Sequence, residues 1–214
     1  PVNDAPVASE LTIGLLEDGT KSGTLPAAVD PDGGTLQYST LTNPSHGTAT
    51  VSASGQYTYT PQANFAGSDS FVYRVSDGAL SAQATVNVLV GAVNDAPVAA
   101  SAAIATDEDT PSAGMLPAAR DADGDPVTYA KSGSPSHGTL SVAPGGSYTY
   151  APAADYTGPD AFTYAVTDGK GGLNTYTVSV TVRPVLDALR GTEAADLLVD
   201  ASGDARLAGF GGDD

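Results

Sequence analysis

The chain has 214 residues, enough for two small domains, and its 8 Lys and Arg against 25 Asp and Glu give a formal net charge of −17. This charge excludes proteins that hold nucleic acid or an anionic membrane through basic residues. Cysteine is absent and histidine occurs only twice, which excludes disulfide frameworks, thiolate catalysis and cysteine-based zinc sites. Because no apolar run approaches the ~20 residues of a membrane span, direct membrane insertion is not expected either. The excess of acids points instead to places that bind cations.

Strand signals dominate the first half of the chain, as short runs in which apolar and polar residues alternate. They fall at residues 11–15, 21–25, 36–40, 48–52, 56–60, 71–75 and 86–90. Alternation with period two, between turns rich in Gly, Pro, Asn and Asp, predicts an antiparallel sandwich of seven strands. The pairs Tyr57/Tyr59 and Phe71/Tyr73 are predicted to be core residues, and the alternative is a stacking platform for sugar.

The same sequence returns 91 residues later, which predicts two copies of one fold. Asn-Asp-Ala-Pro-Val begins at Asn3 and again at Asn94, and Pro-Ser-His-Gly-Thr begins at Pro44 and again at Pro135. After Gly169 the second copy gains one residue. Since seven strands leave the two termini of a sandwich at opposite ends, we expect the copies to follow end to end, over residues 1–92 and 93–186. The chain opens at proline without a leader, so we expect it to be a piece of a longer, exported protein.

Acids fall at matched turns and strand ends of the two copies. They are Asp4, Glu17, Asp30, Asp32, Asp69 and Asp77, and then Asp95, Glu108, Asp121, Asp123, Asp160 and Asp168. Carboxylates held close together repel and lose hydration, and a bound cation removes both penalties. Calcium accepts such oxygen ligands in irregular geometry, whereas zinc and copper prefer His or Cys. The alternative is solvation and turn chemistry, which accounts for single acids but not for their matched recurrence.

Other chemistry finds little support in the sequence. Asp121, Asp123 and Asp125 have the spacing of the first EF-hand ligands, but Ser132 stands where that loop requires Glu. His46 and His137 lie in separate copies and are predicted to be turn residues. No Gly-x-Ser-x-Gly elbow or phosphate loop occurs, so we do not expect an enzyme.

Several of these motifs resemble those of a known family. Val93-Asn94-Asp95-Ala96-Pro97 resembles the calcium-binding linker of cadherins, and Asp121-Ala122-Asp123 resembles their paired-Asp motif. Over about residues 1–187, the ordered set of motifs resembles the bacterial cadherin-like tandem repeats of secreted RTX-type adhesins and biofilm matrix proteins, such as the rhizobial adhering proteins. The resemblance implies an all-β fold of two tandem seven-stranded Greek-key (cadherin/Ig-like) sandwiches, calcium as the cofactor, and a place at the cell surface or in the matrix.

The resemblance also implies three groups of calcium ligands. The junction between the copies would draw on Glu17, Asp69, Asn94, Asp95, Asp121, Asp123 and Asp168. A half-site at the N-terminal end would use Asp4, Asp30, Asp32 and Asp77. A site at the far end would use Glu108, Asp160 and Asp187, where Leu186 replaces the expected Asn. Asp18, Asp109 and Asp125 are either ligands or flanking residues.

The tail, residues 187–214, has a different period. Leu189, Leu198 and Leu207 are nine residues apart, and Gly203 and Gly212 repeat with the same spacing. A nine-residue period of Gly, Asp and Leu resembles the calcium-binding nonapeptide repeats of RTX proteins. Because the match is degenerate, we expect a disordered or only partly ordered start of such a roll.

Together these features predict a calcium-binding module that supports cell-surface or matrix adhesion and is stiffened by calcium between its repeats. One alternative is a passive extender that joins neighbouring repeats of a longer chain. Another is a calcium-dependent lectin for an acidic exopolysaccharide or a cell-surface glycan. Burial of Tyr57, Tyr59, Tyr148 and Tyr150 would weaken the lectin alternative. Homophilic adhesion has no anchoring Trp to support it, since the chain contains none.

Overall fold

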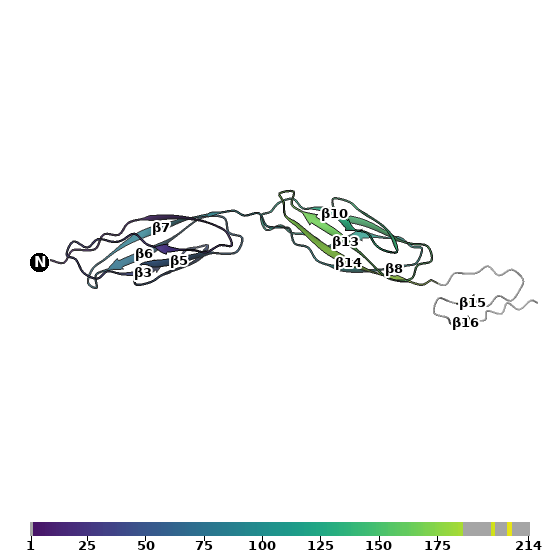
Figure 1. Ribbon diagram of the computed structural model, residues 1–214, viewed down its shortest axis with the longest axis horizontal. Coiled ribbons are helices and arrows are strands. Elements are labelled where there is room, and N and C mark those ends of the chain that lie inside the picture. Colours follow the sequence, from purple (N-terminus) through teal and green to yellow (C-terminus); the bar gives the residue numbers. More distant parts are fainter. Residues whose placement is uncertain (1, 186–197, 200–204, 207–214) are drawn as a thin grey trace, which may run out of the picture. The chain divides into compact units, whose positions relative to one another are not determined.

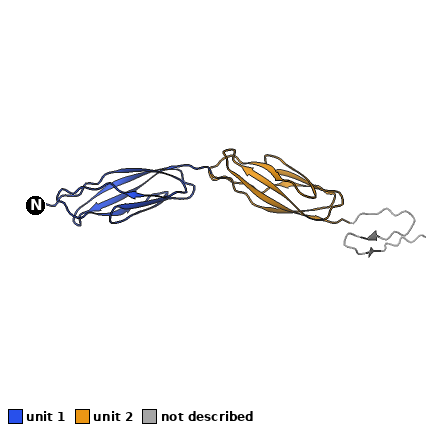
Figure 2. Cartoon of the chain, in the orientation of Figure 1, with its two compact units in different colours: residues 1–94 blue, residues 95–214 orange. Residues whose placement is uncertain are grey.

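The structure is a computed structural model that describes residues 2–185, 198–199 and 205–206. The chain divides into two compact units, residues 1–94 and 95–214, which are coloured separately in Figure 2. The boundary between the two units thus falls after residue 94, two residues beyond the position after residue 92 that the sequence repeat predicts. The predicted boundary at 186/187 falls at undescribed residues and stays a prediction. Every regular element of the described residues is a strand, and no helix capable of crossing a membrane occurs among them.

Unit 1 is a sandwich of seven strands in two sheets (Figure 1). The strands are β1 (Leu11–Leu16), β2 (Lys21–Thr24), β3 (Gln37–Thr42), β4 (Gly47–Val51), β5 (Gln56–Pro61), β6 (Gly67–Ser76) and β7 (Ser81–Gly91). One sheet has the order β1-β7-β6-β3 and the other has the order β2-β5-β4. This is the division of an immunoglobulin-type Greek-key sandwich, with β1 added beside the last strand.

Unit 2 repeats this arrangement strand for strand. Its strands are β8 (Ala102–Asp107), β9 (Ser112–Met115), β10 (Thr128–Gly133), β11 (Gly138–Val142), β12 (Ser147–Pro152), β13 (Gly158–Thr167) and β14 (Leu173–Arg183). The sheets have the orders β10-β13-β14-β8 and β11-β12-β9. Farther along, β15 (Leu198–Val199) pairs antiparallel with β16 (Ala205–Arg206), and the rest of the predicted nonapeptide tail lies outside the described residues.

The first strand of each unit corrects one expectation, because the sandwich is not wholly antiparallel. Strand β1 pairs parallel with β7, with Leu16 opposite Gly91, and β8 pairs parallel with β14. After Leu16 the chain turns through Asp18, whose φ is 60°, and β2 joins the opposite sheet. Strand β1 therefore has no hairpin partner and pairs with the last strand, which runs in the same direction.

The core of unit 1 lies between its two sheets. Phe71, Tyr73 and Val75 on β6 are fully buried, whereas Arg74, between Tyr73 and Val75, is exposed. Tyr59 on β5 is 0% exposed and Tyr57 is 5% exposed, which confirms that both aromatic pairs are core residues. Their counterparts in unit 2 are also buried: Tyr148, Tyr150, Phe162 and Tyr164. Alternation along the strands therefore predicted the buried face correctly.

A carboxylate at the edge of this core anchors a loop. Asp69 accepts hydrogen bonds from the backbone N–H groups of Ser45 (3.0 Å), His46 (3.0 Å) and Ser70 (2.9 Å), and from the hydroxyl of Tyr59 (2.9 Å). Burial raises the pKa of Asp69, but the four hydrogen bonds together lower it by more than burial raises it. The pKa of Asp69 therefore lies below its ordinary value. The carboxylate therefore fixes the loop between β3 and β4 to the core.

The same anchor recurs in unit 2. Asp160 accepts hydrogen bonds from the backbone N–H groups of Ser136, His137 and Ala161 and from the Tyr150 hydroxyl, at 2.8–3.0 Å. Each anchored loop also carries a stacked histidine. The ring of His46 lies 4.3 Å from that of Phe65, and the ring of His137 lies 4.1 Å from that of Tyr156, measured between centroids. These contacts fit the predicted turn role of both histidines.

We expect Asp69→Asn to destabilise unit 1, because an amide keeps the size of the side chain but loses charge-assisted hydrogen bonds worth about 1.5–3 kcal/mol each. The native pKa lies below the ordinary value of 3.8. The stabilisation from Asp69 is therefore complete above pH ~4 and is lost as the pH falls through the native pKa. Thermal melting followed by circular dichroism at pH 7 and pH 3 measures the difference. Asp18→Asn, in an exposed turn, is the control, and equal melting of the two variants at pH 7 would contradict the anchor.

Candidate metal centres

The acidic loop of unit 2 curls around one carboxylate. The backbone N–H groups of Asp123 and Asp125 both donate to Oδ1 of Asp121, at 3.0 and 3.1 Å. Gly124 lies between them with φ of 80°, a conformation that glycine adopts without strain. One carboxylate oxygen from each of the three Asp residues lies within 4.8 Å of the others. The loop thus gathers three negative charges where a single cation could reach them all.

The N-terminal segment of unit 2 joins this loop. Val98 pairs with Arg120 through two backbone hydrogen bonds, of 2.7 and 2.8 Å. Three residues earlier, the N–H of Asp95 donates to Oδ2 of Asp123 at 2.8 Å. The structure therefore brings the predicted ligands Asp95, Asp121 and Asp123 together, and it adds Asp125, whose role the sequence left open.

The turn between β13 and β14 lies against the same loop and begins with a buried acid. Asp168 is 6% exposed and accepts hydrogen bonds from the backbone N–H groups of Lys170 (2.6 Å) and Gly172 (3.0 Å). The ammonium nitrogen of Lys170 lies 2.7 Å from Oδ1 of Asp125. This ion pair connects the Asp168 turn to the acidic loop. We call the whole group the unit 2 cradle; its members are Asp95, Asp121, Asp123, Asp125 and Asp168.

Unit 1 builds the same cradle from Asp4, Asp30, Asp32 and Asp77. The N–H of Asp32 donates to Oδ1 of Asp30 at 2.9 Å, and the N–H of Asp4 donates to Oδ2 of Asp32 at 2.6 Å. The Asn3 amide donates to Oδ2 of Asp77 at 2.8 Å. This hydrogen bond, with those from the backbone of the turn, holds the pKa of Asp77 below its ordinary value. The four acids predicted as an N-terminal half-site are thus connected in one unit.

Buried carboxylate oxygens without a hydrogen-bond donor indicate whether the cradles suit a cation. Oδ2 of Asp30, Asp121 and Asp125 is buried, and no described residue donates a hydrogen bond to any of these three atoms. A buried anionic oxygen without a donor is unfavourable, and a cation is the partner that removes this penalty. All groups of the cradles are hard oxygen donors, and neither cradle contains His or Cys. This donor set suits calcium.

Two further predicted ligands lie at the other end of their units. Glu17 is 4% exposed, and its Oε1 accepts a hydrogen bond from the N–H of Val93 at 2.6 Å. In unit 2, Oε1 of Glu108 accepts one from the N–H of Val185, also at 2.6 Å. Glu17 follows the paired ends of β1 and β7, while Asp77 follows the far end of β6. Glu17 and the unit 1 cradle therefore lie at opposite ends of unit 1.

Four predicted ligands remain. Asp69 and Asp160 use both carboxylate oxygens to hold loops, so we leave them out of the proposed calcium ligands. Asn94 is the last residue of unit 1, and Asp187 lies outside the described residues. Sequence spacing could not separate anchoring acids from cradle acids, because both recur with the same period of 91 residues.

Sequence reasoning also missed Lys170, the basic residue in contact with the unit 2 cradle. A signal was present in the sequence, since the second copy gains its extra residue directly after Gly169. An insertion in a turn that follows a cradle acid places new side chains beside that acid. In this case the new side chain is a cation.

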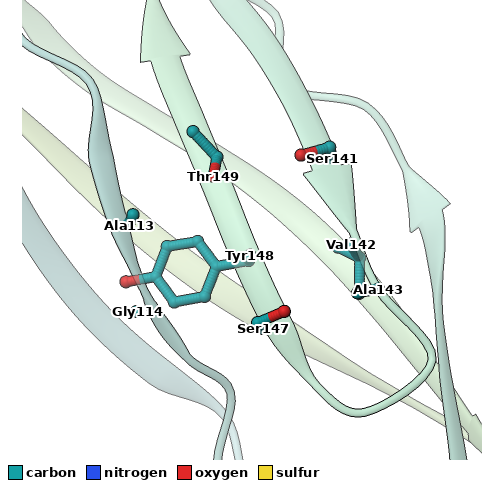
Figure 3. A pocket seen from close by; sticks show the side chains of 8 residues that line it. All are labelled: Ala113, Gly114, Ser141, Val142, Ala143, Ser147, Tyr148 and Thr149. Carbon is teal, nitrogen blue, oxygen red and sulfur yellow. The ribbon is translucent and has the colours of Figure 1, made fainter.

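Another concave feature of unit 2 contains no charged group. It is a shallow cavity of about 340 Å³ against β9, β11 and β12, and Figure 3 shows the ring of Tyr148 among the small side chains that line it. Tyr148 is only 8% exposed, so its ring offers little surface to a ligand. Without carboxylates this cavity is no candidate for a metal.

One solved structure, that of Drosophila N-cadherin EC1-4, supports the sandwich fold. The Drosophila N-cadherin EC1-4 structure matches 85% of this chain over 50% of its own length, at 18% identity and a TM-score of 0.51. Mouse cadherin-23 EC22-24 matches 87% over 68% of its length, at 21% identity and a TM-score of 0.49. The endo-fucoidan hydrolase MfFcnA4 of glycoside hydrolase family 107 matches 85% of the chain at 20% identity and a TM-score of 0.40, and the chain spans 29% of that protein.

Family models match each unit separately. Residues 3–89 match the bacterial Ig domain and residues 94–184 match the bacterial cadherin-like domain, while no curated protein matches the chain. The first copy, predicted to be cadherin-like as the second is, thus matches a different bacterial family of the same sandwich architecture. Each unit is therefore similar to a bacterial sandwich domain, unit 1 to the bacterial Ig domain and unit 2 to the bacterial cadherin-like domain.

Proposed function

We propose that this chain is a calcium-binding adhesion module of a secreted bacterial protein, at the cell surface or in a biofilm matrix. The observation that carries the proposal is the pair of acidic cradles, each holding a buried carboxylate oxygen that no described group satisfies. Bound calcium would supply the positive charge that these oxygens lack. The Asp30 and Asp121 carboxylates, held by the backbone of their loops, would present their free oxygens to it.

The affinity we expect is that of extracellular calcium modules, with a Kd of about 10⁻⁴–10⁻³ M. The cradles would be empty at low calcium and filled after export into a calcium-rich medium. Filling would remove repulsion among Asp121, Asp123 and Asp125, and it would hold the segment at Asp95, which is already hydrogen-bonded to the loop. Calcium would then order the segment that precedes each sandwich.

We extend the proposal to the linker between the repeats. The cadherin resemblance implies a junction set of Glu17, Asp69, Asn94, Asp95, Asp121, Asp123 and Asp168. With Asp69 left out because it holds a loop, the other six would join around shared ions. This grouping comes from the sequence. If it is correct, calcium would fix the angle between neighbouring repeats and turn a jointed chain into a stiff one.

The module is proposed to support adhesion as a calcium-stiffened extender, with a lectin as the alternative. Tyr57, Tyr59, Tyr148 and Tyr150 are at most 8% exposed, so none of these rings offers a stacking face to sugar. That burial favours the extender over binding of an acidic exopolysaccharide or a cell-surface glycan. Bacterial Ig and cadherin-like domains are typically extracellular and non-enzymatic, which supports the proposed location. The RTX-type adhesin context remains part of the proposal.

We expect Asp121→Asn to weaken calcium binding at the unit 2 cradle by about tenfold or more, because it removes the charge of a ligand and replaces its free oxygen by an NH2 group, while the amide oxygen can still accept the two loop hydrogen bonds. Titration of the ¹⁵N-labelled chain with calcium chloride, followed at the amide of Gly124, measures the Kd of this cradle. The amide of Gly33 reports the unit 1 cradle in the same spectra. Asp155→Asn, which removes a charge from an exposed turn of unit 2, is the control. A Kd at Gly124 equal in both variants would show that the ligand assignment is wrong.

Calcium should also change the solution behaviour of the intact chain. Small-angle X-ray scattering with chelator and then with about 10 mM calcium should show a longer, stiffer particle. At 100 times the Kd, each filled site should also stabilise its unit by about 2.7 kcal/mol, which thermal melting detects. An unchanged scattering profile with raised stability would retain calcium binding within the units and refute stiffening of the linker. No change in either measurement would refute the proposed function.

A further inference from the structure

We infer that Lys170 is a built-in competitor that lowers the affinity of the unit 2 cradle for calcium. The inference rests on the proposed calcium binding and deepens it. The ammonium nitrogen of Lys170 lies 2.7 Å from Oδ1 of Asp125, within direct ion-pair distance. The Asp125 side chain is 12% exposed, whereas that of Lys170 is 62% exposed. The chain thus places its own cation on the rim of the cradle, on an oxygen that an incoming metal would use.

The two repeats differ at both members of this ion pair. Gly34 occupies the position in unit 1 that Asp125 occupies in unit 2, 91 residues later. The turn of unit 1 after Asp77 is one residue shorter, and it contains no lysine. Unit 2 therefore contains an acid and a base that unit 1 lacks at these positions, and the fold brings the two into contact. Random surface charges would not be expected to meet in this way.

The backbone fixes Lys170 where it can compete. Its own N–H donates to Oδ1 of Asp168 at 2.6 Å. The N–H of Gly172 donates to both oxygens of Asp168, at 3.0 and 3.1 Å. The turn is thus wrapped around a buried carboxylate on both sides of Lys170. A side chain that starts from a fixed backbone loses less conformational entropy when it forms an ion pair than one on a mobile loop.

The acids beneath Lys170 are arranged so that its charge matters. Oδ2 of Asp121 and of Asp125 is buried without a described donor. The ammonium of Lys170 compensates part of this negative charge while no metal is bound. A calcium ion in the cradle would have to displace Lys170 from Asp125 or bind beside a positive charge. Either route opposes binding, and neither exists in unit 1.

The size of the effect follows from the exposure of the pair. Solvent-exposed ion pairs shift an equilibrium constant by up to about fivefold. We therefore expect Lys170→Ala to lower the calcium Kd of the unit 2 cradle by about two- to fivefold. The same change should lower the melting temperature of the calcium-free chain, because the carboxylates then lose their internal cation.

The test uses the intact ¹⁵N-labelled chain, titrated with calcium chloride to about 10 mM. The amide of Gly124 gives the Kd of the unit 2 cradle, and the amide of Gly33 gives that of unit 1 as an internal reference. Lys131→Ala is the matched control, since it removes the same charge from an exposed position on β10 of the same unit. A double variant, Asp125→Gly with Lys170→Ala, is compared with Asp125→Gly alone.

A lower Kd at Gly124 in Lys170→Ala, with no change at Gly33 and none in Lys131→Ala, would support the inference. The gain should shrink in the Asp125→Gly background, because Lys170 then has lost its partner. If the wild-type chain binds calcium at Gly124 and Lys170→Ala has the same Kd as Lys131→Ala, or a higher one, Lys170 is no competitor and the proposed function stands. If neither amide shifts in any variant, the inference and the proposed function both fail.

Discussion

In each unit the backbone brings several carboxylates close together but supplies too few hydrogen-bond donors for all of their oxygens. The rest of the candidate site depends on this shortage. In the unit 2 cradle the loop N–H groups of Asp123 and Asp125 both bind Oδ1 of Asp121. They leave its Oδ2 buried and without a described donor. An acid that satisfies only half of its hydrogen-bonding capacity from the protein depends on a partner from outside. The unit 1 cradle repeats the arrangement at Asp30.

The contrast with Asp69 and Asp160 shows how the same residue type serves two purposes. Each of these carboxylates receives four donors from its own unit, including a tyrosine hydroxyl from the core. A saturated carboxylate is a structural element that tightens a loop, and it has little to gain from a cation. Asp121 and Asp69 are both acids that recur every 91 residues, so their difference lies wholly in the donors that the fold brings to them.

This difference marks the limit of what the sequence could predict. Alternation along β5 and β6 identified Tyr59, Phe71 and their partners as core, and period-two burial bears this out. The parallel pairing of β1 with β7 could not be read from alternation, because each strand has the same pattern whichever direction its neighbour runs. The cradle acids were found because they recur, but so were the anchoring acids. Only three-dimensional hydrogen bonding separates the two groups.

The two cradles also show how a repeat can diverge without losing its fold. Sheet orders and strand registers are the same in both units, whereas the loop at Asp125 and the turn at Lys170 differ from their counterparts in unit 1. A cradle with an added acid alone would be more repulsive while empty, and one with an added lysine alone would be less attractive to a cation. Asp125 and Lys170 together add no net charge relative to unit 1, so the calcium-free cradle of unit 2 carries no extra repulsion. Binding at unit 2 then becomes an exchange of one cation for another. Under this scheme, Asp125 and Lys170 together would set the calcium concentration at which unit 2 fills.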